Sequence, residues 1–494
     1  MVSLTVGSQG MLRNSMWIVP TLALLGCTPG GSADIVAIDT DLPVVEEVNP
    51  LISGATLSKI VLTQGVDHTL MESGEVPTTV QVPILRKRNA TIRLFVEPGD
   101  EWVERKVQGV VTLTNNDGVE VFTGTRNIEG NSKQADLGTT INIDIPGEFL
   151  TASAELAFEL VEKEEDGPGG GLEEDATWDA GKIQTDVTDS VEIVLFPVRY
   201  NADGSGRLPD TSDSQLERMR EFFYNMYPVS DITISVANPI DWNQSISANG
   251  NGWGSLLDEI ANRRDQANVD PNTYYYGLFN PSPSLGQFCG YGCVLGLSNL
   301  AWNTSSEWPR SSIGLGYPGQ STVDTMVHEV GHAHGREHTP CGLGNQSSDR
   351  DYPYANAELG TWGYHMDEEE LYKPSDYRDM MSYCSPIWVS DYTYFSLWEQ
   401  IKGVGGKRRA VVEKQAWQSI RVDMDGSVYI GQTYQVADPS QDGTPMSVTI
   451  EDEFGVEREV EGYFYPYSHI DGGKLLIPVQ DGPIAAARVP ALGL

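Results

Sequence analysis

The sequence feature that most constrains this chain is the stretch from His328 to His338, which holds four of its seven histidines. His328 and His332 are four residues apart, so on an α-helix both side chains point the same way and can bind one metal ion. Glu329 follows the first histidine, at the position of a carboxylate that takes a proton from a metal-bound water. Gly335 favours the left-handed conformation that ends a helix, and this turn brings His338 back as a third ligand.

Three neutral imidazoles leave one coordination position of a zinc ion for water, which is the pattern of a catalytic rather than a structural site. The shorter His-Glu-x-x-His pattern also occurs on ordinary polar helices. The added glycine and third histidine make the full pattern much more specific. We therefore predict one catalytic Zn²⁺ bound by His328, His332 and His338.

The full pattern, His-Glu-x-x-His-x-x-Gly-x-x-His, resembles that of the metzincin zinc endopeptidases, which also carry a methionine turn beneath the metal. The segment Asp379–Cys384 fits this turn. Met380 is a rival for the role of the turn methionine, but the order Met-Ser-Tyr favours Met381, with Tyr383 two residues later. The resemblance implies that Met381 supports the metal site and that Tyr383 helps to stabilise the oxyanion. It also implies that Glu329 acts as the general base.

The chain has 494 residues, which is too long for one ordinary core and predicts a multidomain protein. We expect a metzincin-like α+β catalytic domain flanked by all-β, sandwich-like domains. The expected divisions are a lipoprotein-type signal peptide at 1–26, a tether at 27–50, a β-sandwich-like domain at 51–186, the zinc protease domain at 187–406 and a C-terminal β domain at 407–494.

Residues that alternate between polar and apolar predict strands in the first β domain. These strands are expected at Ala90–Val96, Val107–Leu113 and Thr140–Ile145. Asn115–Gly118 is typical of a hairpin turn. The acidic, glycine-rich run Glu162–Asp175 is predicted to be a flexible loop or a linker.

Strands and helices alternate ahead of the zinc motif, which is the order in the upper part of metzincin catalytic domains. The strands are expected at Val191–Val198, Asp231–Val236 and Thr273–Phe279, and the helices at Ser212–Tyr227 and over the first part of Ser255–Val269. An edge strand is expected at Val294–Leu300. The metzincin resemblance implies that substrate binds as an added strand along such an edge.

The zinc helix is expected to begin with Ser321 or Thr322 as its cap. A further aromatic helix is predicted at Ser390–Lys402, ended by Gly403. His334 faces away from the ligand side of the zinc helix, so we do not expect it to bind the metal.

His365 is interpreted as a surface or core histidine, because three histidines and water already complete a zinc site. In the C-terminal domain, Asp423–Gly426 predicts a hairpin turn. The aspartates of this turn raise the question of Ca²⁺, but a complete calcium loop is missing, so calcium stays unsupported. The aromatic cluster Tyr463–Tyr467 favours packing over glycan binding.

The formal net charge of −38 excludes two classes of partner. Nucleic acid and anionic membrane surfaces repel such a chain. The expected partner is a protein or glycoprotein substrate.

The N-terminus predicts export. A short apolar run, Met16–Gly26, follows the single charge of Arg13, as in a signal peptide. The residues Leu24 to Cys27 resemble a bacterial lipoprotein processing site, and that resemblance implies lipidation of Cys27. The alternative is an ordinary cleaved signal. We therefore expect a bacterial cell-envelope lipoprotein or an extracellular protein, held to the membrane only by the lipid.

Four cysteines remain if Cys27 is lipidated, and an even number in an exported chain indicates two disulfides. Spacing alone leaves three pairings open. The metzincin resemblance favours Cys341 with Cys384, since the segments after the third ligand and after the methionine lie beneath the same metal. Cys289 then pairs with Cys293.

These observations predict an exported zinc endopeptidase that cleaves internal bonds of extracellular proteins. The domain order is also similar to that of the secreted mucin-degrading (StcE-type) proteases, which implies glycoprotein substrates. One alternative is a cell-surface adhesin or glycan-binding lipoprotein with a vestigial zinc site, although such a site needs neither Glu329 nor Tyr383. A zinc exopeptidase is a third class, but no feature identifies a pocket for a chain terminus.

Overall fold

The computed structural model describes residues 49–79, 81–163, 168–290, 292–300, 302–343, 348–406 and 413–492. The predicted signal peptide and Cys27 lie outside these ranges. The described chain is multidomain and mostly β, with separate hydrophobic cores along the sequence. Across these ranges, no helix combines the length and apolar character that a membrane crossing requires.

Two four-stranded antiparallel sheets form the first part of the chain. The first sheet has the order β2-β1-β4-β7, with bounds Asp67–Glu72, Ala55–Thr63, Ala90–Pro98 and Ile141–Ile145. The second has the order β6-β5-β8-β9, with bounds Gly118–Ile128, Arg105–Asn115, Glu155–Glu162 and Thr177–Lys182. Buried residues of both sheets share one core. Alternate side chains of β5 point into this core, as the period of two in its sequence predicts.

Three short elements accompany these sheets. Strands β3 (Ile84–Leu85) and β10 (Thr185–Asp186) pair in parallel, and α1 spans Glu173–Ala176. Helix α1 and the end of β8 overlap the run Glu162–Asp175, which was predicted to be a loop or linker. Backbone pairing explains part of this order, since the Gly171 N–H donates to the Leu51 carbonyl.

The zinc motif lies on a mixed sheet of order β12-β11-β14-β16-β15, with β13 paired to β11. The bounds are Val191–Tyr200 for β11, Ile232–Val236 for β12, Ile240–Trp242 for β13, Thr273–Phe279 for β14, Gly296–Ser298 for β15 and Ser311–Leu315 for β16. Neighbouring strands from β12 to β16 run parallel, and β15 is antiparallel to β16. Strand β15 therefore forms one edge of this sheet.

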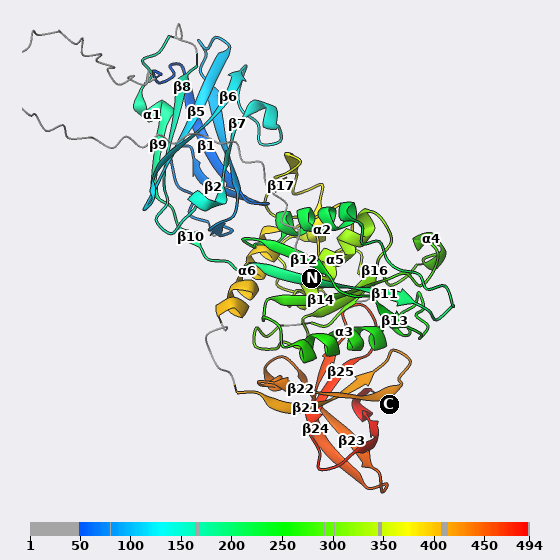
Figure 1. Ribbon diagram of the computed structural model, residues 1–494. Coiled ribbons are helices and arrows are strands. Elements are labelled where there is room, and N and C mark those ends of the chain that lie inside the picture. Colours follow the sequence, from blue (N-terminus) through cyan, green and yellow to red (C-terminus); the bar gives the residue numbers. More distant parts are fainter. Residues whose placement is uncertain are drawn as a thin grey trace, which may run out of the picture. The chain divides into compact units, whose positions relative to one another are not determined.

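Helices cover both faces of this sheet. Helices α2 (Asp213–Met226) and α5 (Gln320–Ala333) pack on one face, and α3 (Trp253–Ala267) packs on the other (Figure 1). Strand β14 is buried throughout, with Tyr274 and Tyr276 in the core of α2 and α5, and Tyr275 and Phe279 in the core of α3. Burial on both faces explains its almost continuous apolar sequence.

The start of α5 differs from the prediction. The helix begins at Gln320 after Gly319, so neither Ser321 nor Thr322 is its cap. The Thr322 hydroxyl instead donates to the backbone carbonyl of Tyr317 at 2.5 Å. This bond ties the first turn of α5 to the loop that leaves β16.

Helix α6 (Asp391–Gly406) also differs, because it continues past Gly403. A Cβ atom at Gly403 would lie 2.8 Å from Cγ2 of Thr304. The glycine therefore allows a close approach to a neighbouring loop and does not end the helix. The remaining short elements here are α4 (Leu285–Phe288), β17 (Gly363–His365), β18 (Glu370–Tyr372), β19 (Arg378–Asp379) and β20 (Ile387–Trp388).

The C-terminal part is a six-stranded antiparallel sheet of order β22-β21-β25-β24-β23-β26. Its bounds are Gln415–Val422 for β21, Val428–Val436 for β22, Thr444–Asp452 for β23, Glu457–Pro466 for β24, Gly473–Pro478 for β25 and Ile484–Arg488 for β26. The predicted turn Asp423–Gly426 joins β21 to β22, with Gly426 at a φ of +83°. In the aromatic cluster, Tyr465 and Tyr467 are buried, which fits packing.

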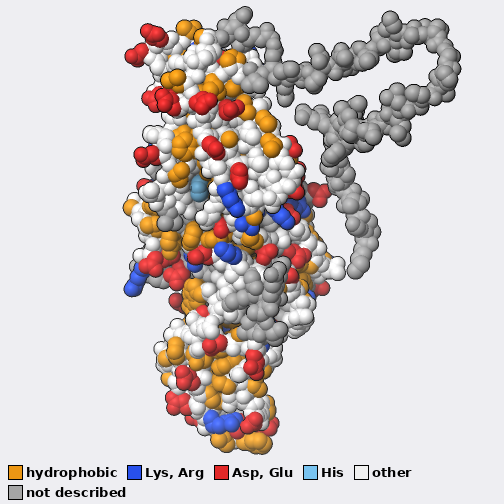
Figure 2. All heavy atoms as spheres, turned by 90° about the vertical axis from the view of Figure 1, so that its left-hand side faces the viewer, with side chains coloured by type: hydrophobic (Ala, Val, Ile, Leu, Met, Phe, Trp, Pro, Cys, Tyr) orange, Lys and Arg blue, Asp and Glu red, His pale blue; other side chains and the backbone are white. Residues whose placement is uncertain are grey.

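The surface is acidic, as the net charge requires. Figure 2 shows Asp and Glu side chains at many places on the face in view, with several Lys and Arg side chains near its middle.

Candidate zinc site

Helix α5 and the turn after it bring three histidines together. His328 and His332 lie on successive turns of α5, and Gly335 follows with a φ of +79°. This left-handed residue reverses the chain, and the side chain of His338 returns to the same point. All three histidines are buried.

The three rings converge through their Nε2 atoms. Nε2 of His332 lies 3.1 Å from Nε2 of His328 and 3.1 Å from Nε2 of His338. Tetrahedral zinc with Zn–N bonds of about 2.0–2.1 Å separates its nitrogen ligands by about 3.3 Å. The three imidazoles therefore fit a zinc ion, with no rearrangement of the helix or the turn.

The other nitrogens of two of these rings are held by the backbone. Nδ1 of His328 lies 2.7 Å from the Met380 carbonyl, and Nδ1 of His332 lies 2.6 Å from the Arg336 carbonyl. A carbonyl accepts only an N–H, so each Nδ1 carries the proton and each Nε2 presents a lone pair. Burial lowers the pKa of His328 to about 4, which keeps this ring in the neutral, metal-binding form.

Glu329 is buried beside the three histidines, against the edge strand β15. A Cβ atom at Gly296 would lie 2.4 Å from Oε1 of Glu329, so only glycine leaves room for the carboxylate. Burial raises the pKa of Glu329 to about 8, while the nearby His328 and a hydrogen bond with Ser468 lower it. A carboxyl group with a pKa near neutrality can both accept and release a proton.

The segment predicted to be a methionine turn packs against helix α5, which carries His328 and His332. Met381 is fully buried, and a Cβ atom at Gly331 of α5 would lie 2.4 Å from its Sδ atom. The buried Asp379 carboxylate accepts from the Met381 N–H at 2.8 Å and fixes the turn. Tyr383 follows with a partly exposed side chain, and its ring centroid lies 4.8 Å from that of His338.

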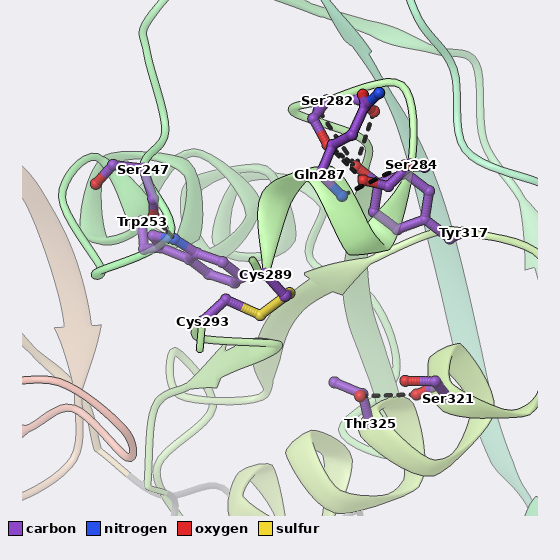
Figure 3. Close-up of a disulfide and its surroundings, with 10 residues drawn as sticks. All are labelled: Ser247, Trp253, Ser282, Ser284, Gln287, Cys289, Cys293, Tyr317, Ser321 and Thr325. Carbon is purple, nitrogen blue, oxygen red and sulfur yellow. Dashed lines mark hydrogen bonds between the residues drawn. A yellow bond between two sulfur atoms is a disulfide. The ribbon is translucent and has the colours of Figure 1, made fainter. Parts of the chain in front are cut away.

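Two disulfides border this region, with the pairings expected from the sequence. Cys341–Cys384 joins the chain after His338 to the methionine turn. Cys289–Cys293 closes a short loop that leads into β15. Figure 3 shows this second bond beside the indole of Trp253, whose N–H donates to the Ser247 carbonyl at 2.9 Å. The two disulfides indicate an oxidising, extracellular compartment.

A cleft of about 510 Å³ opens beside His328. Strand β15, helix α5 and the methionine turn line it through Gly296, Glu329 and Tyr383. Its size and its mixture of apolar and ionisable groups are typical of a ligand site.

The structure adds a fourth histidine that the sequence reasoning missed. His469 lies between β24 and β25, and one ligand atom of each of His328, His332, His338 and His469 lies within 4.8 Å of the others. Its Nε2 is 2.7 Å from Oε1 of Glu329, and its Nδ1 is 2.5 Å from the Tyr383 hydroxyl. The one signal in the sequence was that histidine is scarce: six of the seven histidines lie outside the C-terminal domain, which leaves His469 as the single histidine of residues 407–494.

Two other histidines near the motif point elsewhere. His334 is buried, stacks on Tyr274 with a centroid distance of 4.1 Å and donates from Nδ1 to the Val330 carbonyl. His365 is buried between Phe222 and Trp388. Neither ring points to the metal-binding atoms.

Comparison with known protein families identifies part of the chain. Residues 299–385 match the family model described as Peptidase M66, a zinc metallopeptidase family of the StcE mucinase type. The resemblance to zinc metallopeptidases is confirmed over this segment, which contains the histidine motif and the methionine turn. The match and the histidine cluster together support a zinc-dependent peptidase. The comparison with curated proteins finds no match.

Proposed function

We propose that this protein is an exported zinc-dependent endopeptidase of the metzincin type that cleaves extracellular proteins, glycoproteins among them. The observation that carries the proposal is the convergence of three Nε2 atoms beside the buried Glu329. A structural zinc site needs no such carboxylate. The family match over residues 299–385 and the two disulfides support the peptidase and its export.

His328, His332 and His338 hold the zinc ion in this proposal. When bound, zinc supplies a Lewis acid that polarises the peptide carbonyl and makes water more acidic. The backbone carbonyls on two of the Nδ1 atoms keep these rings oriented for binding. Met381 and the Cys341–Cys384 bond support the ligands from below.

Glu329 acts as the general base and then as the general acid. Its carboxylate takes a proton from the attacking water and passes it to the nitrogen of the leaving amine. Because Gly296 has no side chain, the Glu329 carboxylate can lie against β15, beside the histidines. Tyr383 donates its hydroxyl proton in a hydrogen bond to the developing oxyanion.

The remaining chain has supporting roles in this proposal. Residues 187–406 form the α+β catalytic domain, 51–186 and 407–494 form the flanking β domains, and 1–26 direct export. Lipidation at Cys27, followed by the tether 27–50, anchors the protein to the cell envelope. The edge strand β15 pairs with the substrate backbone beside the zinc ion.

The test compares the purified chain from residue 27 onward with Glu329→Gln. Both proteins are assayed on casein and on a mucin-type glycoprotein, their zinc content is measured, and the fragments are mapped by mass spectrometry. Glutamine keeps the size of the side chain but cannot take a proton. We expect one zinc per chain in both proteins, internal cuts by the wild type, and a loss of about 10²–10⁴-fold in the variant.

Two outcomes contradict the proposal. Absence of zinc from the wild type removes the metal site on which the mechanism depends. Trimming from the chain ends, without internal cuts, indicates an exopeptidase instead.

A further inference from the structure

The hairpin loop between β24 and β25 enters the zinc site. This loop, residues 467–472, is closed by a hydrogen bond from the Tyr467 N–H to the Gly472 carbonyl. Tyr467 is buried in the core of α3, and Ile470 lies so close to Gly250 that a Cβ atom there would be 2.7 Å from its Cγ2. The loop is therefore anchored on both sides of His469.

The same loop binds the free edge of β15. Ser298 uses its N–H and C=O on the side away from β16: the N–H donates to the Ser468 hydroxyl at 3.0 Å, and the C=O accepts from the Ser468 N–H at 3.4 Å. Asn299 and Tyr467 form an antiparallel bridge next to these bonds. The loop thus occupies backbone groups to which an added strand would bind.

His469 lies where the reacting groups must meet. Its Nε2 is 2.7 Å from the Glu329 carboxylate, and its Nδ1 is 2.5 Å from the Tyr383 hydroxyl. Its ring centroid lies 4.8 Å from that of His338 and 5.1 Å from those of His328 and His332. The ring therefore stands between the proposed base and the proposed oxyanion donor, beside the three ligands.

We infer that His469 is a fourth zinc ligand and that the loop 467–472 holds the enzyme latent. To bind zinc, Nε2 of His469 exchanges its contact with Glu329 for the metal, while Nδ1 keeps its contact with the Tyr383 hydroxyl. Four imidazoles then complete a tetrahedral zinc site and leave no position for water. The ring also occupies the space between Glu329 and Tyr383, and Ser468 binds the β15 edge. The inference rests on the proposed function. Cleavage requires the hairpin to leave the cleft, by movement or by proteolysis.

Four proteins test this inference: the wild type, His469→Ala, His469→Asn, and Asp471→Ala as the control. Asp471 lies in the same loop, is exposed, and does not line the cleft. His469→Asn provides a second variant of polar character, and circular dichroism checks the fold of each protein. Zinc X-ray absorption counts the bound imidazoles. Acetohydroxamic acid, a small zinc chelator, reports access to the metal through the visible spectrum of the Co²⁺-substituted protein.

We expect four imidazoles in the wild type and in Asp471→Ala, and three in both His469 variants. Acetohydroxamic acid binds the wild type only in the fraction of molecules whose loop is open, so we expect at least about 10-fold tighter binding to the His469 variants. We also expect at least about 10-fold faster casein cleavage by His469→Ala. The added Glu329→Gln change removes that gain.

Three outcomes separate the inference from the proposed function. If X-ray absorption counts only three imidazoles in the wild type, His469 is not a zinc ligand. Slower cleavage by both His469 variants, with zinc retained, overturns latency and makes His469 a catalytic residue. A third outcome is that the His469 variants lose the fourth imidazole and bind the chelator more tightly, while none of the proteins cleaves casein. This outcome supports His469 as a zinc ligand and contradicts the proposed peptidase activity.

Discussion

Gly296 shows how one residue defines the proposed catalytic carboxylate. It is part of the edge strand β15, and the position of its missing Cβ atom lies within 2.4 Å of Glu329 Cγ and Oε1. A side chain at this position and the observed carboxylate cannot occupy the same space. Strand β15 therefore needs a glycine here because of a neighbour and not because of its own conformation.

The change Gly296→Ala should displace Glu329 and lower kcat by about 10–100-fold, because a misplaced general base loses much of its contribution. Zinc content should stay at one per chain, since the three ligands are untouched. Gly290→Ala is the control, because its Cβ atom would lie 3.8 Å from the nearest atom. Steady-state kinetics with zinc analysis of both variants makes the comparison. An unchanged kcat in Gly296→Ala would show that the Glu329 carboxylate can move aside without loss of activity, which contradicts this prediction.

Asp67 gives a prediction for pH at the same scale. Burial raises its pKa from 3.8 to about 6, although Arg93 and a hydrogen bond from Gln134 lower it. The folded chain therefore keeps a proton that the unfolded chain loses between about pH 4 and 6, so this residue contributes stability at low pH that disappears as the pH rises.

Relative to Asp67→Asn, the wild type should lose about 2–3 kcal/mol of unfolding free energy between pH 4 and pH 7. Asparagine does not titrate, so the difference between the two proteins isolates this carboxyl group. Urea titrations of both proteins at several pH values measure it. A difference that is constant with pH would mean that the folded-state pKa of Asp67 is normal.

At the scale of elements, the two disulfides allow a matched comparison. Cys341–Cys384 spans 43 residues of sequence and Cys289–Cys293 spans 4. Closing a longer loop removes more entropy from the unfolded chain, by about 4 kcal/mol for the first bond and about 2 kcal/mol for the second. The longer bond also ties the segment after His338 to the methionine turn.

Replacing both cysteines of the longer bond by serine should therefore cost about 2 kcal/mol more unfolding free energy than the same change in the shorter bond. Only the first double variant should bind zinc more weakly. Chemical denaturation and competition with a zinc chelator measure the two effects. Equal zinc affinity in both double variants would show that α5 and its turn hold the site alone.

The elements themselves were largely predictable from local patterns. Strand β14 has the predicted bounds, Thr273–Phe279, because burial on both faces leaves a continuous apolar run. The ends of helices were less predictable. Glycine is typical of a helix end, but Gly403 lies within α6. Its missing Cβ atom leaves room for the side chain of Thr304. Glycine at 319, rather than a hydroxyl residue, precedes α5.

The candidate site was predictable only where its residues are close in sequence. The spacing of His328, His332 and His338 records the geometry of one helix and one turn. His469 follows the last of these ligands by more than a hundred residues and arrives on a hairpin of another sheet. No short-range sequence pattern predicts such a contact, because the contact depends on how that sheet packs against α3 and β15.

At the scale of the whole molecule, Asp258 holds the C-terminal sheet to helix α3. Its carboxylate oxygens lie 2.8 Å from Nζ of Lys474 and 3.2 Å from Nη1 of Arg421. The side chain of Lys474 is 1% exposed, so its charge depends on this partner. Lys474 belongs to β25, the strand that follows the loop with His469. The same ion pairs that fix the sheet therefore hold the loop in the cleft.

The change Asp258→Ala leaves a buried lysine without its acidic partner, which should cost about 3 kcal/mol. Hydrogen exchange in β24, β25 and the intervening loop should then accelerate by roughly 100-fold, while exchange in α5 changes little. The control is Glu259→Ala on the same helix, whose ion pair with Arg263 is exposed and should contribute less than about 1 kcal/mol. Equal exchange in the two variants would show that the sheet docks through its apolar contacts alone. Acceleration confined to Asp258→Ala, together with tighter binding of acetohydroxamic acid to the Co²⁺-substituted protein, would place the control of zinc access in the docking of the C-terminal sheet.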